Sequence, residues 1–262
     1  MSSTIGPHFQ ELYRYRGLVS SLVLRELKAR YRGSVLGFLW TFLNPLMLLA
    51  VYALVFSVYF RIQMEHYAGF MFTGLLPWIW FSSSLLEGTT AIASGGSLIT
   101  KVLFPGQILP LVKVGANLLN YLLSLPVLLI FLTAMGLSPG SALVWLPLVV
   151  AVHLIFIAGL SLALATLNVF LRDIQHILSN LVTLWFFLTP ILYPLAQVPQ
   201  AFRRWVLLNP ATLITLSYQD IFFYRRSPDL LYLGTFFILA LVVLGLGITL
   251  FEHYKETLAE KI

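Results

Sequence analysis

The residues of this 262-residue chain that could do chemistry are few and scattered. None of its five histidines has the spacing to a second ligand that metal sites use, and no two acids are placed for general acid–base work. Without cysteine it has no thiol nucleophile, no Cys-ligated metal and no disulfide. No G-x-x-x-x-G-K-[ST] run occurs, so the chain itself carries no P-loop. We therefore expect no enzymatic activity, no catalytic residue and no metal or cofactor in this chain.

Two ionisable side chains, Glu87 and His153, lie inside long apolar runs. A charge at membrane depth is costly and by default faces the bundle interior or water. Glu87 is therefore either a polar contact in a channel or a buried acid that is paired or neutral. His153 is better explained as a packing or hydrogen-bonding group than as a ligand.

Composition places the chain in a membrane. Hydrophobic residues make up 59% and charged residues 10% of it, whereas soluble domains carry roughly 25% charged residues. The net charge of +6 arises mainly from Lys and Arg near predicted membrane edges, so the positive-inside bias explains it better than nucleic-acid binding. We expect no nucleic-acid partner, and the first 16 residues do not have the pattern of a secretory signal.

The apolar runs predict an all-α membrane protein with six transmembrane helices, because about 20 apolar residues cross the hydrocarbon. They cover residues 35–60, 70–93, 111–135, 143–170, 177–195 and 230–251. The sequence predicts a single domain over residues 1–262. It begins with a cytoplasmic tail and interfacial helix (1–34), followed by spans one to five (35–195) and an outer region (196–229). Span six (230–251) and a second cytoplasmic tail (252–262) complete it. Lys and Arg gather on the inner side of this topology, which places both termini in the cytoplasm.

A basic amphipathic helix is predicted just before the first span. Val23, Leu27 and Tyr31 form an apolar stripe, and Arg25, Lys28 and Arg32 share another face. Such a helix suits a surface of anionic headgroups. Gly33 is the expected bend into the first span, and Asn44-Pro45 is expected to kink that span.

Two connections are unusual. The inner loop 95–110 keeps apolar residues beside Lys101, which indicates either docking to a partner or a helix lying flat in the headgroups. In the outer region, residues 206–218 are too short to cross and are predicted to be re-entrant or interfacial.

Aromatic residues make up 15% of the chain. A lipid-interface belt or simple core packing explains most of them. Some could instead line a path for sugars, whose C–H faces stack on rings. The candidates for channel lining, together with Glu87, are Trp40, Tyr59, Trp78, Phe81 and Trp185.

Five stretches carry a resemblance to a known family. RELKARYRGSVLGFLWTFLNPL, SLITKVLFPGQILPL, NVFLRDIQHIL, LTPILYP and LNPATLITLSYQDIFFY together resemble the permease subunit of ABC-2 type exporters. The most similar group exports O-antigen, capsule or teichoic-acid polysaccharides. The resemblance implies a homodimer in the inner membrane of a bacterium that binds two copies of a separate ATPase, which would hold ATP and Mg. It implies outward movement of a lipid-linked polysaccharide.

The resemblance also implies roles for particular residues. The inner loop after the second span is similar to a coupling helix, so ATPase coupling is assigned to Leu98, Lys101, Val102, Phe104, Pro105, Arg172 and Asp173. The region after the fifth span resembles outer gate helices, with Asn209, Pro210 and Tyr218 as gate residues. Arg25, Lys28 and Arg32 are assigned to bulk lipid or to the phosphate or pyrophosphate of the carrier.

Two other functions fit the same features. An ABC-2 exporter of drugs or lipids would share the fold, but the basic helix and the aromatic content favour polysaccharide. A secondary transporter would need a coupling-ion site near the midplane, for which only Glu87 and His153 are candidates.

Overall fold

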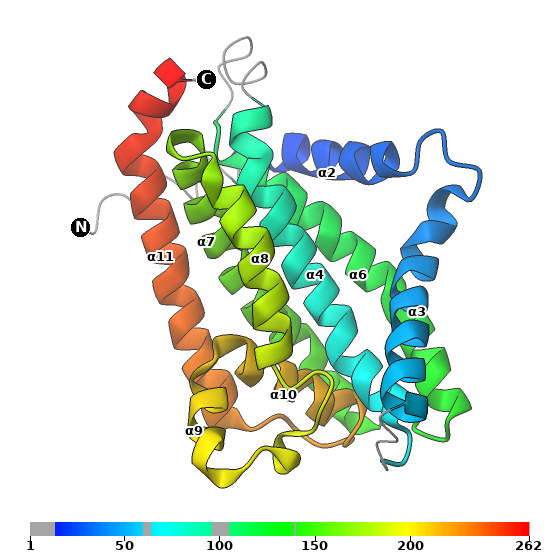
Figure 1. Ribbon diagram of the computed structural model, residues 1–262. Helices are drawn as coiled ribbons and strands as arrows, with labels where there is room; N and C mark the ends of the chain where they lie inside the picture. The colour runs from blue at the N-terminus through cyan, green and yellow to red at the C-terminus, as the bar shows by residue number, and fades with distance from the viewer. Residues whose placement is uncertain (1–13, 60–63, 96–104, 139, 262) are drawn as a thin grey trace.

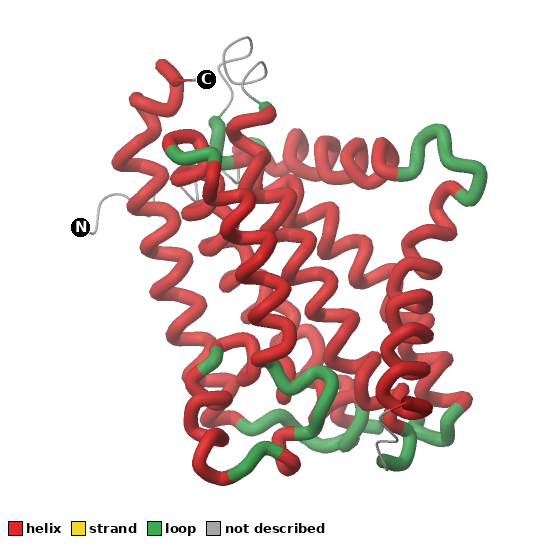
Figure 2. Tube along the Cα trace, in the orientation of Figure 1, coloured by secondary structure: helices red, strands yellow, loops and turns green. Residues whose placement is uncertain are grey.

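The protein, seen in a computed structural model, is described for residues 14–59, 64–95, 105–138 and 140–261. Within these ranges the chain forms helices joined by loops (Figures 1 and 2). Helix α2 (Arg16–Arg30) lies across one end of the bundle, where α11 also ends, and the short helices α9 and α10 lie at the opposite end (Figure 1).

In the part of the chain that the structure describes, five helical segments are long and apolar enough to cross a membrane. The first, Gly37–Tyr59, consists of a 3₁₀ turn (Gly37–Leu39), α3 (Trp40–Ala53) and a π-helical end (Leu54–Tyr59). The others are α4 (Tyr67–Ser94), α6 (Ile108–Ala134), a 3₁₀ turn with α7 (Ser141–Trp145 and Leu146–Phe170), and α11 (Leu230–Lys261). The bounds of the first four segments closely match those of the predicted spans one to four.

The predicted fifth span is shorter than expected. Helix α8 covers Asp173–Leu188, 16 residues, instead of continuing to Leu195, and it is not among the five candidate spans. The cause is Pro190, because the residue before a proline is pushed out of the helical region, and Thr189 is extended (φ −100°, ψ 136°). The irregular backbone that follows is buried and bonded: Gln219 donates to the Pro190 carbonyl (2.7 Å) and Tyr67 to the Leu192 carbonyl (2.6 Å).

The sixth predicted span ends later than expected. The sequence placed a separate tail at 252–262, yet α11 runs on as one helix to Lys261.

At the crossing of α11 with α7, small residues let the two backbones approach closely. A Cβ on Gly159 would lie 2.5 Å from the Leu244 Cα, and Gly247 of α11 meets the Gly159 carbonyl.

Helix α4 is the centre of the bundle. It packs against α3, α6, α7, α8 and α10, and 78% of its most apolar window is buried, against 17% for the first span. The core around it includes Phe70, Phe72, Trp80 and Leu85. The first span therefore presents most of its apolar surface outward.

The expected bend at Gly33 has a structural counterpart, whereas the kink expected at Asn44-Pro45 stays a prediction. Gly33 adopts φ +83° in the turn after α2, a conformation that suits glycine. Pro45 lies within α3 and cannot donate to the Thr41 carbonyl. The Ser124 hydroxyl of α6 lies 3.2 Å from that carbonyl and 2.8 Å from the Asn120 carbonyl of its own helix, so its single proton is shared between these two acceptors.

The outer region contains two helices where the sequence suggested one segment. Helix α9 (Gln200–Leu208) has no buried residue, whereas α10 (Pro210–Phe222) is buried along nearly its whole length. The chain turns between them at Asn209, whose side chain accepts a bond from the Ala211 N–H and caps α10.

Candidate functional site

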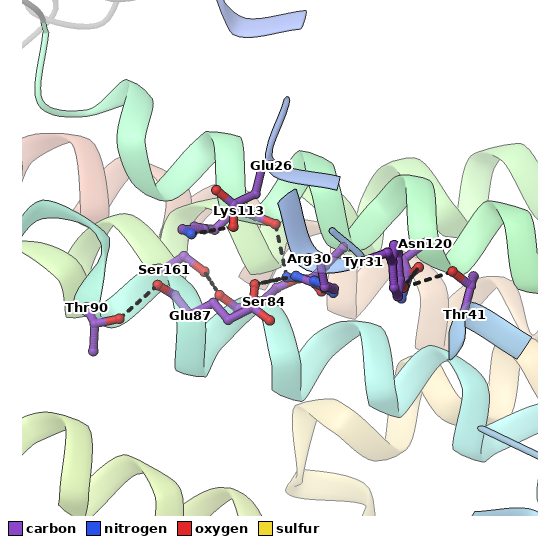
Figure 3. A network of polar contacts seen from close by, with 11 residues as sticks. Glu26, Arg30, Tyr31, Thr41, Ser84, Glu87, Thr90, Lys113, Asn120 and Ser161 are labelled. Carbon is purple, nitrogen blue, oxygen red and sulfur yellow. Dashed lines mark hydrogen bonds and ion pairs between the residues drawn. The ribbon is translucent and has the colours of Figure 1, made fainter. Parts of the chain in front are cut away.

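A polar cluster joins α2, α4 and α6 at the end of the bundle where α2 lies (Figure 3). The Arg30 guanidinium donates to the Glu87 carboxylate (2.6 Å) and to the Asn117 side-chain oxygen (2.9 Å). Asn117 in turn donates to the same Glu87 oxygen (2.9 Å). Glu87 is therefore a paired acid whose side chain is 35% exposed, and its role as a polar contact in a channel stays a prediction.

A second set of bonds extends the cluster along α2. Lys113 of α6 forms an ion pair with Glu26 (2.6 Å). The Tyr31 hydroxyl donates to Asn120 (2.8 Å) and accepts from the Thr41 hydroxyl (2.8 Å), which ties the end of α2 to both α6 and α3 (Figure 3). Four helices are thus held together by side-chain hydrogen bonds in one region.

Apart from Glu26 and Lys113, the residues of this cluster border a cavity of about 370 Å³ between α2, α3, α4 and α6. Two of the predicted channel-lining residues, Trp40 and Glu87, lie on its wall. Its polar lining includes Arg30, Tyr31, Asn44, Ser83, Asn117 and Asn120. This is the candidate site, because it combines a cavity, several polar groups and an ion pair.

Sequence reasoning missed Arg30 as a site residue, although a signal was present. Arg30 is three residues after Leu27 and seven after Val23, so it lies on the stripe that faces α6. Val23 and Leu27 are buried, and Val23 packs with Ile108, Val112 and Ala116. A basic residue on this buried stripe, such as Arg30, is well placed to form an ion pair with Glu87, the lone acid of α4.

The three basic residues that the sequence did select have a different environment. Arg25, Lys28 and Arg32 are exposed, on the part of α2 and its following turn that faces away from the bundle core. Their assignment to headgroups stays a prediction.

The other predicted channel residues form a separate group. Trp78, Phe81 and Trp185 are in mutual ring contact, with centroid separations from 5.2 to 6.4 Å. Trp78 also borders a second cavity of about 330 Å³ between α3, α4 and α8. Tyr59 lies apart from both groups, exposed near the end of the first span.

Two of the predicted gate residues connect the outer helices to this core. Asn209 accepts a bond from the Trp185 indole N–H (2.6 Å) and donates to the Thr189 hydroxyl (3.0 Å), so it links α8 to α10. Tyr218 is fully buried and lies 3.3 Å from the ring of His153. His153 packs against Trp80 and Phe81, as expected for a buried hydrogen-bonding group. Pro210 is the first residue of α10.

Of the coupling residues, only three fall within the described chain. Arg172 and Asp173 are exposed at the turn between α7 and α8, and Pro105 precedes α6. Leu98, Lys101, Val102 and Phe104 lie outside the described residues. In the part of the chain that is described, no group of three His, Asp or Glu side chains could hold a metal ion.

This helical bundle with its five candidate spans belongs to the ABC-2 type transporter family, which matches residues 17–223. The chain is 49% identical to the O-antigen export system permease protein RfbA of Myxococcus xanthus, over 97% of this chain and 98% of that protein. It is 33% identical to the RfbA protein of Klebsiella pneumoniae, over 90% and 91% of the two chains. It is 26% identical to the polysialic acid transport protein KpsM of Escherichia coli, over 92% and 94%.

Proposed function

We propose that this chain is the transmembrane permease of an ATP-driven exporter that moves a lipid-linked polysaccharide out across the cytoplasmic membrane of a bacterium. The observation that carries the proposal is the 49% identity to an O-antigen export permease over 97% of the chain. A polysaccharide relative also appears at lower identity, and it too matches over most of the chain. Nothing in the structure favours the drug, lipid or secondary-transport alternatives over this one.

We propose six crossings, with α8 as the fifth. Its 16 residues span about 24 Å, and the buried segment Thr189–Leu192 adds length toward the roughly 30 Å of a hydrocarbon core. An even number of crossings puts both termini on one side, which is consistent with α2 and the end of α11 lying at the same end of the bundle (Figure 1). Helices α9 and α10 would then be the outer re-entrant gate.

The ATPase would be a separate protein, present in two copies with its ATP and Mg, because this sequence has no P-loop. We place its docking surface at the α2 end of the bundle, where Pro105, Arg172 and Asp173 lie. The exposed Arg25, Lys28 and Arg32 would contact the carrier's phosphate or the surrounding anionic lipid.

Reconstitution tests this function. The chain alone in proteoliposomes should hydrolyse little ATP, and adding its ATP-binding partner should give hydrolysis coupled to movement of lipid-linked polysaccharide. Replacing ATP with a non-hydrolysable analogue is the control and should abolish movement. Strong hydrolysis by the isolated chain, or export of a drug but not of polysaccharide, would contradict the proposal.

A further inference from the structure

The 370 Å³ cavity has the chemistry of a saccharide site. We infer that it binds a neutral, hydroxyl-rich sugar unit within a single protomer, at the α2 end of the bundle. This inference rests on the proposed function and adds to it a specific place where the glycan is recognised. Ligand pockets of proteins are typically about 300–1,000 Å³, so the cavity has room for such a unit.

Hydrogen-bonding groups without a protein partner line the cavity. Asn44 of α3 and Ser83 of α4 make no side-chain hydrogen bond within the described part of the chain. The Trp80 indole N–H has no partner among the described residues, but Trp80 is only 2% exposed, so this N–H does not face an occupant of the cavity. The side chain of Asn44 is exposed and that of Ser83 is half-buried, so both are free to hydrogen-bond to a polar occupant.

Aromatic rings lie beside these polar groups. The half-buried Trp40 borders the cavity from α3 and can present a ring face to it, whereas Trp80 and Tyr121 stack on each other (centroids 5.0 Å apart, planes 16° apart) and are nearly fully buried. Rings offer flat apolar faces for the C–H surface of a sugar, while amides and hydroxyls serve its hydroxyl groups. Water alone would use the polar groups but gain nothing from the rings.

The charges of the lining argue against a phosphate ligand. Arg30 and Glu87 are the charged side chains on the wall, and they neutralise each other at 2.6 Å. A phosphate would meet the Glu87 carboxylate, and it would have to compete with that carboxylate for Arg30. A neutral polyol can instead bond to both without separating them. The unpaired basic residues Arg25 and Lys28 are exposed outside the cavity, where a carrier phosphate would meet no carboxylate partner of this site.

Cysteine labelling can test the inference, because the chain has no native cysteine. Ser83→Cys and Asn44→Cys place one thiol each on the α4 and α3 walls, and Ser94→Cys, an exposed position on α4 outside the cavity, is the matched control. The complete transporter in nanodiscs is reacted with a hydrophilic maleimide in the presence of lipid-pyrophosphate-linked polysaccharide or of the bare lipid pyrophosphate. The glycan-bearing carrier should slow labelling of both cavity thiols at least fivefold, the bare carrier less than twofold, and neither should affect Ser94→Cys.

Each other outcome overturns the inference in a distinct way. Equal protection by the bare carrier would make the cavity a phosphate or lipid site. Absence of protection at both cavity positions would leave it a hydrated space only. ATP-dependent export is measured on the same preparation, so intact export without protection rejects the sugar site alone, whereas no export by the wild-type transporter rejects the proposed function.

Discussion

At Arg30 a single side chain connects three helices, since its guanidinium reaches Glu87 of α4 and Asn117 of α6. Both charged groups are partly buried, with side chains 24% and 35% exposed. Exposed ion pairs contribute little to the free energy of unfolding, whereas breaking a fully buried pair lowers it strongly, and this pair is intermediate between the two. The pair also spans 57 positions of sequence, so it fixes how α2 meets the bundle.

We expect Arg30→Ala to lower stability by about 1 kcal/mol or more, because Glu87 would lose a charged partner in a partly buried position. Glu87→Gln should cost less, since a glutamine oxygen can still accept from Arg30 and Asn117. Thermal unfolding of the purified variants in detergent measures both, with the exposed Lys28→Ala as control. Equal, negligible shifts for all three would show that the pair does not hold α2.

A second ion pair predicts a dependence on pH. Asp220 of α10 is 6% exposed, and burial raises the pKa of its carboxyl, an effect that the hydrogen bond from Arg226 (2.7 Å) partly offsets. In Arg226→Ala the lowering effect of Arg226 is lost, so the pKa of Asp220 should rise further. A raised pKa in the folded state gives stability that is present at low pH and lost as pH rises through that pKa. The variant should therefore be less stable than wild type at pH 8 and recover part of the difference at pH 5.

The measurement is the melting temperature of the variant against wild type at both pH values. Arg204→Ala, at an exposed position of α9, controls for the loss of a positive charge from the outer region. A deficit that is the same at pH 5 and pH 8 would contradict the role of the Asp220 charge.

At the scale of elements, the contact between α7 and α11 depends on the absence of side chains. The backbone of Leu244 lies so close to Gly159 that a Cβ there would be 2.5 Å from the Leu244 Cα, and backbone cannot move aside as a side chain can. This pair of helices makes the most extensive contact in the described bundle, so strain at the crossing would spread along both.

Gly159→Ala should accordingly destabilise the protein by about 1–3 kcal/mol, the usual cost of overpacking a close interface. Gly245→Ala is the matched control, because the added methyl would meet no atom within 4 Å and alanine favours the helix. Fluorescence-detected size-exclusion chromatography after heating reports the folded fraction. If Gly159→Ala melts like Gly245→Ala, the crossing is not a tight contact.

At the scale of the whole molecule, the described protomer leaves most of the apolar surface of the first span uncovered. Only 17% of its most apolar window is buried, and Leu36 and Val51 are 42% and 58% exposed. Lipid could cover this surface, but a second copy of the chain would also enclose the second cavity beside α3, which a polymer pathway between protomers requires.

Single cysteines at Leu36 or Val51 should therefore form crosslinked dimers in membranes upon mild oxidation. Leu246→Cys on α11, which is 64% exposed and belongs to the helix across the bundle from α3, should stay monomeric (Figure 1). The absence of crosslinks at both first-span positions in an active transporter would argue against a dimer through α3.

The sequence by itself determined the membrane class, the first four spans to within a few residues and the stripe of α2, because hydrophobic length and periodicity are local properties of the chain. It also located the lone acid Glu87. Pro190 was visible too, yet the predicted span ran past it, since a run of apolar residues does not reveal where a helix stops.

Only the tertiary structure decided which groups meet. The pairing of Arg30 with Glu87 and Asn117 joins residues 57 and 87 positions apart, and no local pattern encodes that distance. The contact of Ser124 with the Thr41 carbonyl, the burial of α10 and the separation of Trp40 and Glu87 from Trp78 by two different cavities likewise follow from helix packing. Side-chain periodicity predicts the face that a residue occupies, but the arrangement of the other helices determines what that face contacts.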